Sequence, residues 1–588
     1  MKLKGIYGLV VTIVLGIILG ACSDFLDREP NSYTSEGFFK SEAAIRDGVA
    51  GIYNLTYMER IVVPAVTRND YWSPTFCERA QNTTINAGGG MNPDQSEILT
   101  WWQQQYNLIA RANSLIFGSA EALDGLSDLA KQYVAEARLL RAYAYYNLIA
   151  YFGDVPFFTE PITIEDYTAG RNSKVDILDF IISELETAAA YLPWVSSERG
   201  RVNKAAAYGL EARAGLLGGS LNYGGKGSTY FSIAASAAKK VIDSGTHHLA
   251  ANFGDLFNLI GQEKSDVQSE LIWELMYSAN GTKKRHWTAF GQVSRNQGQT
   301  GRHPTHIIGE AFECIDGKRI DESSLYDPTH PSHNRDPRFE QTLWMHGDTC
   351  SVNYSTVITL VLNAFDMTTS FYNYDTQSWE TRNNADINST AAWASFINSG
   401  CGYVAAKYSH EITENIQNQT CNVAVLRYAE ILLTYAEAKI EMNKLDYSVY
   451  DAINQVRRRA GMPDISEDRI GNLQKMRQIV RRERKVELAM EGLHSIDMRR
   501  WGTGDIENME PSYGGPLADV RYEGMVGCIP NFKTNERTDL NDIPSHEAYK
   551  DKLHVRDANR YWDPKFSLFP IPQKEIDRDN NITQNEGY

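Results

Sequence analysis

The stretch "LRYAEILLTYAEAKIEMNK", Leu426 to Lys444, is followed after six residues by "DAINQVRRRAGMP", Asp451 to Pro463. Both segments repeat apolar residues at spacings of three and four, which is the periodicity of a helix with one buried face. Alanine recurs in both, as expected where two helices must approach closely, and Gly461 and Pro463 stop the second segment. The two segments therefore predict a helix hairpin.

The same pattern recurs elsewhere in the chain. No strict repeat period is visible, but paired, alanine-rich helices of similar length have the composition of tetratricopeptide-like hairpins. Stacks of such hairpins form rigid scaffolds. With the two helices of the hairpin included, the predicted helices are Lys131–Tyr151, Asn203–Leu217, Ser228–Ser244, Arg427–Met442, Tyr447–Ala460 and Leu473–Glu491.

Between Asp255 and Val425, and again from Met509 to Lys552, the sequence is rich in Gly, Asn, Ser, Thr, Tyr and Trp. Short β-like runs occur there, such as "SVNYSTVITLVLNAF" from Ser351 to Phe365. Loops of this composition carry function when a rigid scaffold holds them. We predict a mainly α fold, in which a tetratricopeptide-like helix-pair scaffold carries a loop-rich lobe with a few short β-strands.

We expect one compact unit made of two regions. The predicted divisions are a signal segment at 1–21, an N-terminal helical region at 22–245, and a C-terminal region at 246–588 that holds the loop-rich lobe (about 255–425), helices (426–502) and a tail.

The first residues have the three parts of an export signal. Lys2 and Lys4 precede an uncharged apolar run, which leads through small residues to Cys22. The run is shorter than the roughly 20 residues that span a bilayer comfortably, although an uncleaved membrane anchor is the alternative. The boundary resembles a bacterial lipoprotein signal, whose cysteine is acylated. Acyl chains on Cys22 would hold the mature protein to a membrane.

The composition excludes several classes of function. The chain carries 58 basic and 74 acidic residues, a formal net charge of −16, which argues against a nucleic-acid or anionic-lipid partner. After the signal, no segment approaches 18 uninterrupted apolar residues. The remaining cysteines have no metal-site spacing, and both disulfides and buried thiols stay open. They are Cys77, Cys314, Cys350, Cys401, Cys421 and Cys528.

Six motifs in a fixed order, after the lipoprotein signal and "DFLD", resemble the SusD/RagB family over essentially the whole mature chain. They are "EARLLRAYAYYNLIAYFGDVPFF" (136–158), "NRDPRF" (334–339), "LRYAEILLTYAEA" (426–438), "AINQVRRRAG" (452–461), "RRERKVELAMEGLHSIDMRRWG" (481–502) and "FPIPQKEIDRDNNITQNEGY" (569–588).

The resemblance implies a lipoprotein on the outer face of the Gram-negative outer membrane. SusD-like proteins sit as a lid on a SusC-like TonB-dependent barrel and bind oligosaccharides, or peptides in the RagB branch, for import. They are not enzymes and use no cofactor. Two other possibilities stay open: a surface glycoside hydrolase, which needs only two carboxylates across a cleft, and a purely structural lid.

Charged residues in these motifs favour a structural role. Glu483 and Glu487 lie one helical turn apart among basic residues, a spacing that suits ion pairs within the helix. We expect Arg138 and Arg141 to be buried partners of carboxylates rather than ligand contacts.

Sugar rings stack on aromatic side chains, and their hydroxyls pair with Asn, Asp and Arg. The strongest candidate site is therefore "RNDYWSPTFCERAQN", with Asp70, Tyr71, Trp72, Arg79 and Asn82. The alternative is that Trp72 fills the underside of its own loop, because indoles are highly buried on average.

Two further aromatic segments are candidates. Trp287 lies between a basic run and a Gly/Gln-rich loop that contains Arg295. Tyr372 lies among Phe371, Tyr374 and Trp379, although crowded aromatic residues more often pack on one another. We expect Trp102 and Tyr106 to be core residues, and Trp101 stays open.

The sequence contains no recognised catalytic motif. The pairs His303/His306 and His330/His333 are each interrupted by proline, so the rings need not converge, and we predict no metal site. Calcium binding by loop carboxylates stays open.

Overall fold

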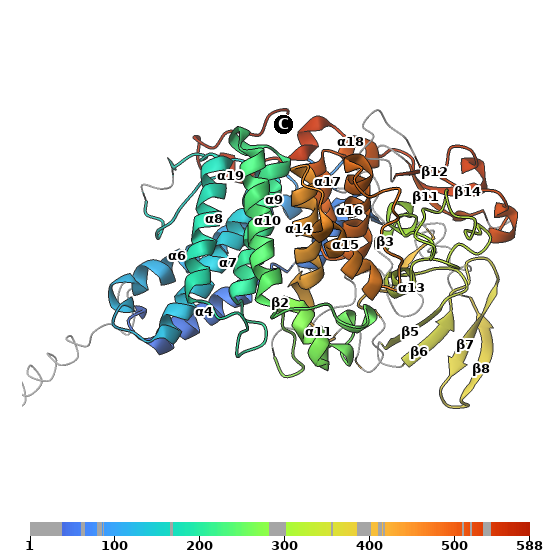
Figure 1. Cartoon of the computed structure of the whole chain (residues 1–588), viewed down its shortest axis with the longest axis horizontal. Coiled ribbons are helices and arrows are strands. Elements are labelled where there is room, and N and C mark those ends of the chain that lie inside the picture. Colours follow the sequence, from blue (N-terminus) through green and yellow to red (C-terminus); the bar gives the residue numbers. More distant parts are fainter. Residues whose placement is uncertain are drawn as a thin grey trace, which may run out of the picture.

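The computed structural model describes residues 38–59, 65–78, 85, 88–164, 168–281, 302–353, 357–384, 402–409, 414, 418–508, 511–517, 520–532 and 543–588. Figure 1 shows a stack of helices on one side of the molecule and a lobe of strands and loops on the other. The signal segment and Cys22 lie outside the described residues. Within the described residues, no helix is long and apolar enough to cross a membrane.

The helices follow one another through the scaffold, and each lies against a sequence neighbour or near neighbour (Figure 1). All six helices predicted from periodicity are present, with ends that differ by a few residues. The main helices are α4 (Glu42–Thr56), α6 (Ser96–Leu123), α7 (Asp128–Phe152), α8 (Lys174–Tyr191), α9 (Lys204–Ser220), α10 (Gly227–Ser244), α14 (Tyr428–Glu441), α15 (Tyr447–Arg459), α16 (Leu473–Glu487) and α17 (His494–Trp501).

Local sequence explains where these helices begin. Ser127 accepts a hydrogen bond from the Ala130 amide at the start of α7, and Asn203 accepts one from Ala206 at the start of α9. Asp446 does the same for α15. Such side chains satisfy amides that have no partner within the helix. The helix boundaries are thus encoded locally.

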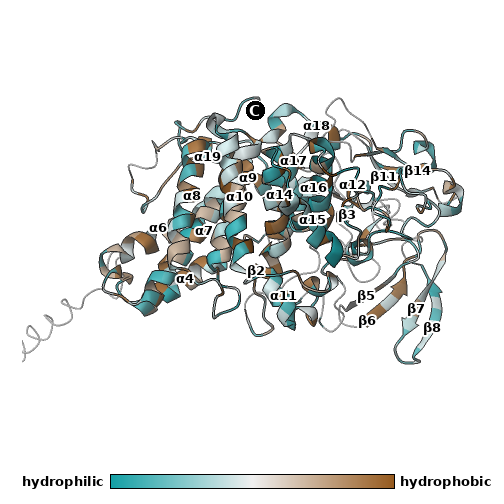
Figure 2. Cartoon of the chain, viewed as in Figure 1, coloured by the Kyte–Doolittle hydropathy of each residue, from teal (hydrophilic) through white to brown (hydrophobic). Residues whose placement is uncertain are grey.

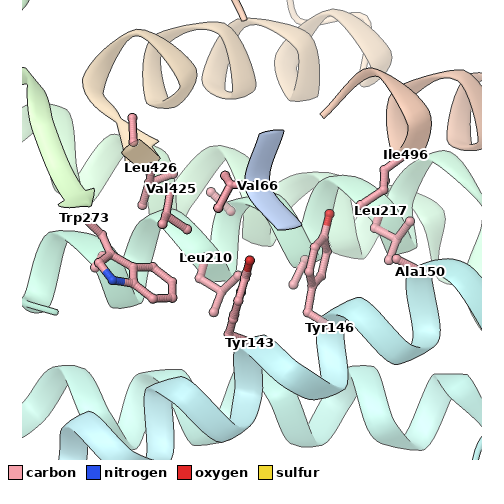
Figure 3. Packing of buried hydrophobic residues seen from close by; sticks show 14 of the residues in the cluster. Val66, Tyr143, Tyr146, Ala150, Leu210, Leu217, Trp273, Val425, Leu426 and Ile496 are labelled. Carbon is pink, nitrogen blue, oxygen red and sulfur yellow. The ribbon is translucent and has the colours of Figure 1, made fainter. Parts of the chain in front are cut away.

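The helices share one apolar core, part of which Figure 3 shows. Tyr143 and Tyr146 project from α7 toward Leu210 and Leu217 of α9, and Ile496 of α17 lies nearby. Both faces of α7 are covered, because the helix is buried on nearly all sides from Tyr133 onward. The scaffold is therefore stiff, with its central helix fixed by neighbours all round.

The strands form small antiparallel sheets in the lobe and at its junction with the helices. The mainly α fold with a few short strands is confirmed, including strands within Ser351–Phe365. One sheet has four strands in the order β5 (Thr349–Asn353), β6 (Val357–Val361), β7 (Thr368–Asn373) and β8 (Ser378–Asn383). The pairs are β1 (Phe76–Glu78) with β3 (Arg302–Pro304), β2 (Leu271–Leu275) with β10 (Val423–Arg427), β4 (Leu343–Trp344) with β9 (Val404–Ala405), β11 (Ser512–Pro516) with β14 (Leu553–Asp557), and β12 (Asn531–Phe532) with β13 (Pro544–Ser545).

A buried network of arginines and carboxylates joins the scaffold to the lobe, and Figure 2 shows α15 to α17 as hydrophilic although many of their residues are buried. Arg338 of the short helix α13 (Arg338–Thr342) donates to Glu483 (2.6 Å) and Glu487 (2.7 Å) of α16. Arg427 also donates to Glu487. The structural role predicted for the two glutamates is confirmed. The prediction of pairs within the helix is wrong, because arginines from other elements reach these carboxylates.

The other structural predictions are settled in the same way. Arg138 and Arg141 both donate to the buried carboxylate of Glu184, as expected, but only Arg141 is itself buried. Cys77, Cys314, Cys350, Cys421 and Cys528 are buried and form no disulfide with one another, whereas Cys401 lies outside the described residues.

Candidate ligand-binding site

The strongest candidate from the sequence, Asp70 to Trp72, lies in the core. These residues form a turn of 3-10 helix, and their exposed fractions are 1% for Asp70, 2% for Tyr71 and 3% for Trp72. The Trp72 ring packs edge-on against the rings of Trp101 (5.5 Å) and Phe569 (5.1 Å). The prediction that Tyr71 and Trp72 stack on a ligand is therefore wrong, because neighbouring aromatic rings already cover them.

Asp70 is also occupied within the protein. Its carboxylate accepts hydrogen bonds from the backbone amides of Gly492 (3.0 Å) and His494 (3.1 Å), which fixes the start of α17. Burial raises the pKa of Asp70 to about 6. The predicted ligand contact is thus wrong for Asp70 as well. Trp101 and Trp102 are core residues too, with exposed fractions of 0% and 3%.

Arg79, Asn82, Trp287 and Arg295 lie outside the described residues. The strands beside them are described, however, and Glu78 of β1 pairs with Arg302 of β3. Segments 79–84 and 282–301 therefore join the same end of one two-stranded sheet. The pairing of β1 with β3 thus brings together the points where two separately predicted binding segments leave the sheet.

Directly after β3 lies a pocket with a cavity of about 60 Å³, here called the imidazole pocket. His306, the first residue of helix α12 (His306–Gly309), forms one wall. Five tyrosine rings, two imidazoles and a carboxylate are among its lining residues. The polar and aromatic lining residues are His306, Glu310, Tyr326, Tyr403, Tyr513, Tyr522, His546 and Tyr549.

The two imidazoles of this pocket have spare hydrogen-bonding capacity. His546 Nε2 bonds Glu310 Oε1 at 2.8 Å, while His546 Nδ1, Glu310 Oε2 and both ring nitrogens of His306 have no partner among the described residues. The rings of His306 and His546 lie 4.8 Å apart and perpendicular. Buried polar atoms are normally satisfied, so four unpaired atoms around one cavity indicate a place for a polar ligand or ordered water.

Burial keeps His306 neutral. Desolvation, with smaller effects from His546 and Arg560, lowers the pKa of His306 well below its ordinary value. A neutral imidazole offers one N–H donor and one lone pair, which matches a hydroxyl group that also donates and accepts. The pocket therefore has the chemistry to bind uncharged hydroxyl groups.

The position of Tyr403 depends on a glycine of α12. A Cβ added at Gly309 would lie 2.4 Å from the Tyr403 ring carbon Cζ, far inside van der Waals contact. Glycine at 309 therefore lets the tyrosine ring close one side of the pocket.

A second pocket of about 280 Å³, here called the outer pocket, adjoins the first and shares Pro331, Met345 and Tyr522 with it. Burial raises the pKa of Asp348 in its wall to about 6. The His330 and His333 rings, which need not converge on the sequence alone, do lie stacked 5.0 Å apart. Even so, no group of three or more His, Cys, Asp or Glu residues fit to hold a metal ion occurs in the part of the chain that the structure describes.

Two other pockets are larger but less suggestive of a ligand. A groove of about 530 Å³ runs between α6 and the C-terminal tail, past Trp102, Tyr106 and Ile582. Its lining contains no buried polar side-chain atom that lacks a partner. A pocket of about 510 Å³ is lined by arginines such as Arg457, which already pairs with Glu313 at 2.8 Å.

Sequence reasoning missed the residues of the imidazole pocket. His306 entered it only as half of a possible metal pair, and Glu310, Tyr403, His546 and Tyr549 were not considered. The remaining candidate, Tyr372, lies half-buried on β7 and is not among the residues that line either pocket.

Comparison with known proteins gives the same family along most of the chain. The model of the SusD family matches residues 269–588, and a family described as starch-binding, associating with the outer membrane, matches residues 24–216. Two SusD-like proteins of Formosa agariphila, P25 and P2, are each 24% identical to this chain. They cover 89% and 98% of it, over 96% and 99% of their own lengths.

Solved structures share the fold. A SusD-like carbohydrate-binding protein from Bacteroides fragilis superposes with a TM-score of 0.72 at 23% identity, covering 93% of this chain and 100% of its own. A structure with a xylogluco-oligosaccharide superposes with a TM-score of 0.64 at 18% identity, covering 92% and 97%.

Proposed function

Because the chain belongs to the SusD family, we propose that it is a non-catalytic receptor that captures oligosaccharides and delivers them to a SusC-like TonB-dependent transporter. Acyl chains on Cys22 would tether it to the outer face of the outer membrane. The names of its relatives, which include a carbohydrate-binding protein and an oligosaccharide complex, support a glycan ligand.

The observation that carries the proposal is the set of unpaired polar atoms in the imidazole pocket. His306 and His546 present nitrogens that no described residue pairs with, and tyrosine rings surround them. Hydroxyl groups would satisfy these nitrogens, and the aromatic rings would contact the C–H faces of the sugar. The outer pocket, about 280 Å³ in volume, would take the next part of the ligand.

The proposed site extends to the two segments beside the pocket. Arg79 and Asn82 follow β1, and Trp287 and Arg295 precede β3, whose end leads within two residues to His306. We assign these four residues to ligand binding on that proximity and on their side-chain chemistry. Trp287 would add an indole to the tyrosine rings that line the described part of the pocket.

A glycan array with the purified protein, followed by calorimetry on the ligand it identifies, tests the proposal. His306→Gln, His546→Gln and Trp287→Ala should each weaken binding at least tenfold while unfolding midpoints change little. Asn107→Ala, in the groove beside α6, is the matched control and should bind like the wild type.

Two results would overturn the proposal. Steady release of reducing ends from the ligand would indicate a glycoside hydrolase. Binding of peptides alone, with no response on the glycan array, would indicate a RagB-type peptide receptor.

A further inference from the structure

The four-stranded sheet β5–β8 projects from the lobe at the end of the molecule farthest from the N-terminal helices (Figure 1). Its inner face packs on the lobe, because Cys350 and Leu360 are buried in a small apolar cluster and Phe371 packs against it. Side chains alternate between the two faces of a strand, so the residue next to each of these along its own strand points away from the lobe. The outer face is not part of that cluster.

The register places a row of four residues straight across this outer face. Ser351 pairs with Thr359, Thr359 with Tyr372, and Tyr372 with Trp379. The row crosses three inter-strand spacings, roughly 14 Å. One half of the row carries hydroxyl groups, and the other half carries aromatic rings.

The rings form a compact and open surface. Tyr372 packs edge-on against Tyr374 (4.9 Å) and Trp379 (5.7 Å). Trp379 is 50% exposed and Tyr374 is 45% exposed, so their rings are not used to fill a core. Exposed aromatic residues grouped in this way mark a surface for interaction.

The hydroxyl groups beside the rings are already ordered. Thr359 Oγ1 lies 2.6 Å from Ser351 Oγ and 2.8 Å from the Tyr374 hydroxyl. This chain of three hydroxyls holds the Tyr374 ring in place without using any charge. Ring faces next to neutral hydroxyls suit the C–H faces and hydroxyls of an uncharged sugar chain.

The sheet also begins beside the proposed site. β5 begins at Thr349, immediately after Asp348 of the outer pocket, and Ser351 lies two residues further, roughly 7 Å along the strand. The amide of Leu362, at the end of β6, donates to the Asp348 carbonyl at 2.8 Å. The sheet therefore starts at the wall of the outer pocket, within reach of a long ligand that extends from it.

We propose that Tyr372, Tyr374 and Trp379, here called the aromatic platform, form a second binding surface for neutral polysaccharide chains that extend beyond the imidazole pocket. The inference rests on the proposed function. The aromatic platform would make affinity depend on the length of the glycan, since a short oligosaccharide fills the pockets and only a polymer also reaches the platform. Two linked contacts bind more tightly than either alone.

The test compares polymer and oligomer on the purified full-length protein. Affinity electrophoresis through gels that contain xyloglucan or amylopectin measures polymer binding, and calorimetry with the corresponding short oligosaccharides measures the pockets. We expect the double variant Tyr372→Ala/Trp379→Ala to bind the polymer about tenfold more weakly and the short oligosaccharide within twofold of wild type. Thr381→Ala, on the same face of β8, is the control and should match wild type in both assays.

The outcomes separate this inference from the proposed function. Equal retardation of the double variant and the wild type, or wild-type binding to oligosaccharides without binding to any polymer, overturns the platform and leaves the receptor proposal intact. Absence of any glycan binding overturns both. Loss of a dimer in the double variant, seen by sedimentation, would assign the platform to a second copy of the chain and overturn the inference.

Discussion

Replacement of Arg338 by methionine tests how the loop-rich lobe is held on the helices. The guanidinium is 1% exposed and donates to three carboxylates, those of Glu483 (2.6 Å), Glu487 (2.7 Å) and Asp336 (2.7 Å). Methionine keeps most of the volume and removes the charge. The change in stability therefore reports mainly the electrostatics.

The structure indicates which carboxylate would lose its cationic partner in Arg338→Met. Glu487 would keep Arg427 and Arg459, and Glu483 would keep Arg457 at 3.2 Å. Asp336 would lose its cationic partner and keep only amide donors, including the backbone N–H of residue 338 at 2.9 Å. One buried carboxylate would thus be left without a counter-charge.

Breaking a buried ion pair in this way costs about 3–5 kcal/mol of unfolding free energy. The matched control is Arg458→Met, which removes an arginine paired with Asp464 at the surface, where its side chain is 52% exposed. Surface pairs contribute less than about 1 kcal/mol. We therefore expect a difference of at least 2 kcal/mol between two substitutions of the same chemistry.

Urea unfolding followed by both circular dichroism and tryptophan fluorescence measures the difference, and agreement of the two probes checks for a single transition. Adding Asp336→Asn to Arg338→Met should restore about 1–2 kcal/mol, since the amide removes the unpaired charge. Equal losses for the Arg338 and Arg458 variants would refute the argument. So would a double variant no more stable than Arg338→Met alone.

Three further predictions follow from particular contacts. Trp72→Ala should lower the unfolding free energy by about 3–5 kcal/mol because the indole is in the core, and a stable variant with weakened ligand affinity would contradict that placement. Burial lowers the pKa of His303 to about 3, so the unfolded chain takes up a proton below pH 6.5 while the folded chain does not, and stability falls as the pH drops. Between pH 7 and 5, the unfolding free energy measured by urea titration should therefore fall by about 2 kcal/mol more for wild type than for His303→Phe. Equal decreases in the two proteins would refute this. Gly309→Ala should weaken glycan binding in calorimetry by displacing the Tyr403 ring, and unchanged affinity would show that the ring is not part of the site.

The helices could be predicted because their signals are local. In α7 the capping side chain, the apolar spacing and the terminal glycine all lie within one continuous segment, from Ser127 to Gly153. Helix ends differ from the predicted ends by only a few residues for the same reason. Such elements need no knowledge of distant residues.

The position of Trp72 could not be predicted in this way. Its neighbours in sequence, Asp70 and Ser73, are polar and suggest a loop, but Asp70 is satisfied by the amides of Gly492 and His494. The covering ring of Phe569 is also distant in sequence. Polar residues next to an indole therefore say little about exposure when tertiary contacts satisfy them.

The candidate pocket was missed for a related reason. Its central hydrogen bond joins Glu310 and His546, which are 236 residues apart, and each lies in a segment without a recognisable motif. Only the fold brings them together. The sequence offers one indication of the pocket: His306 follows the predicted binding segment that contains Trp287 and Arg295. Its spacing from His303 suggests only a metal pair.

The charges of the site argue for a particular class of glycan. The protein carries a net charge of −16, and both pockets add carboxylates, Glu310 in one and Asp348 in the other. His306 cannot offset them, because its lowered pKa leaves it neutral. Within the described part of the site, a sulfated or uronic-acid chain would therefore meet like charge at long range and a neutral His306 in the pocket. Neutral sugars would avoid both costs, and their hydroxyls would complete hydrogen bonds that His306 leaves open among the described residues, so this part of the proposed site would favour them over acidic glycans.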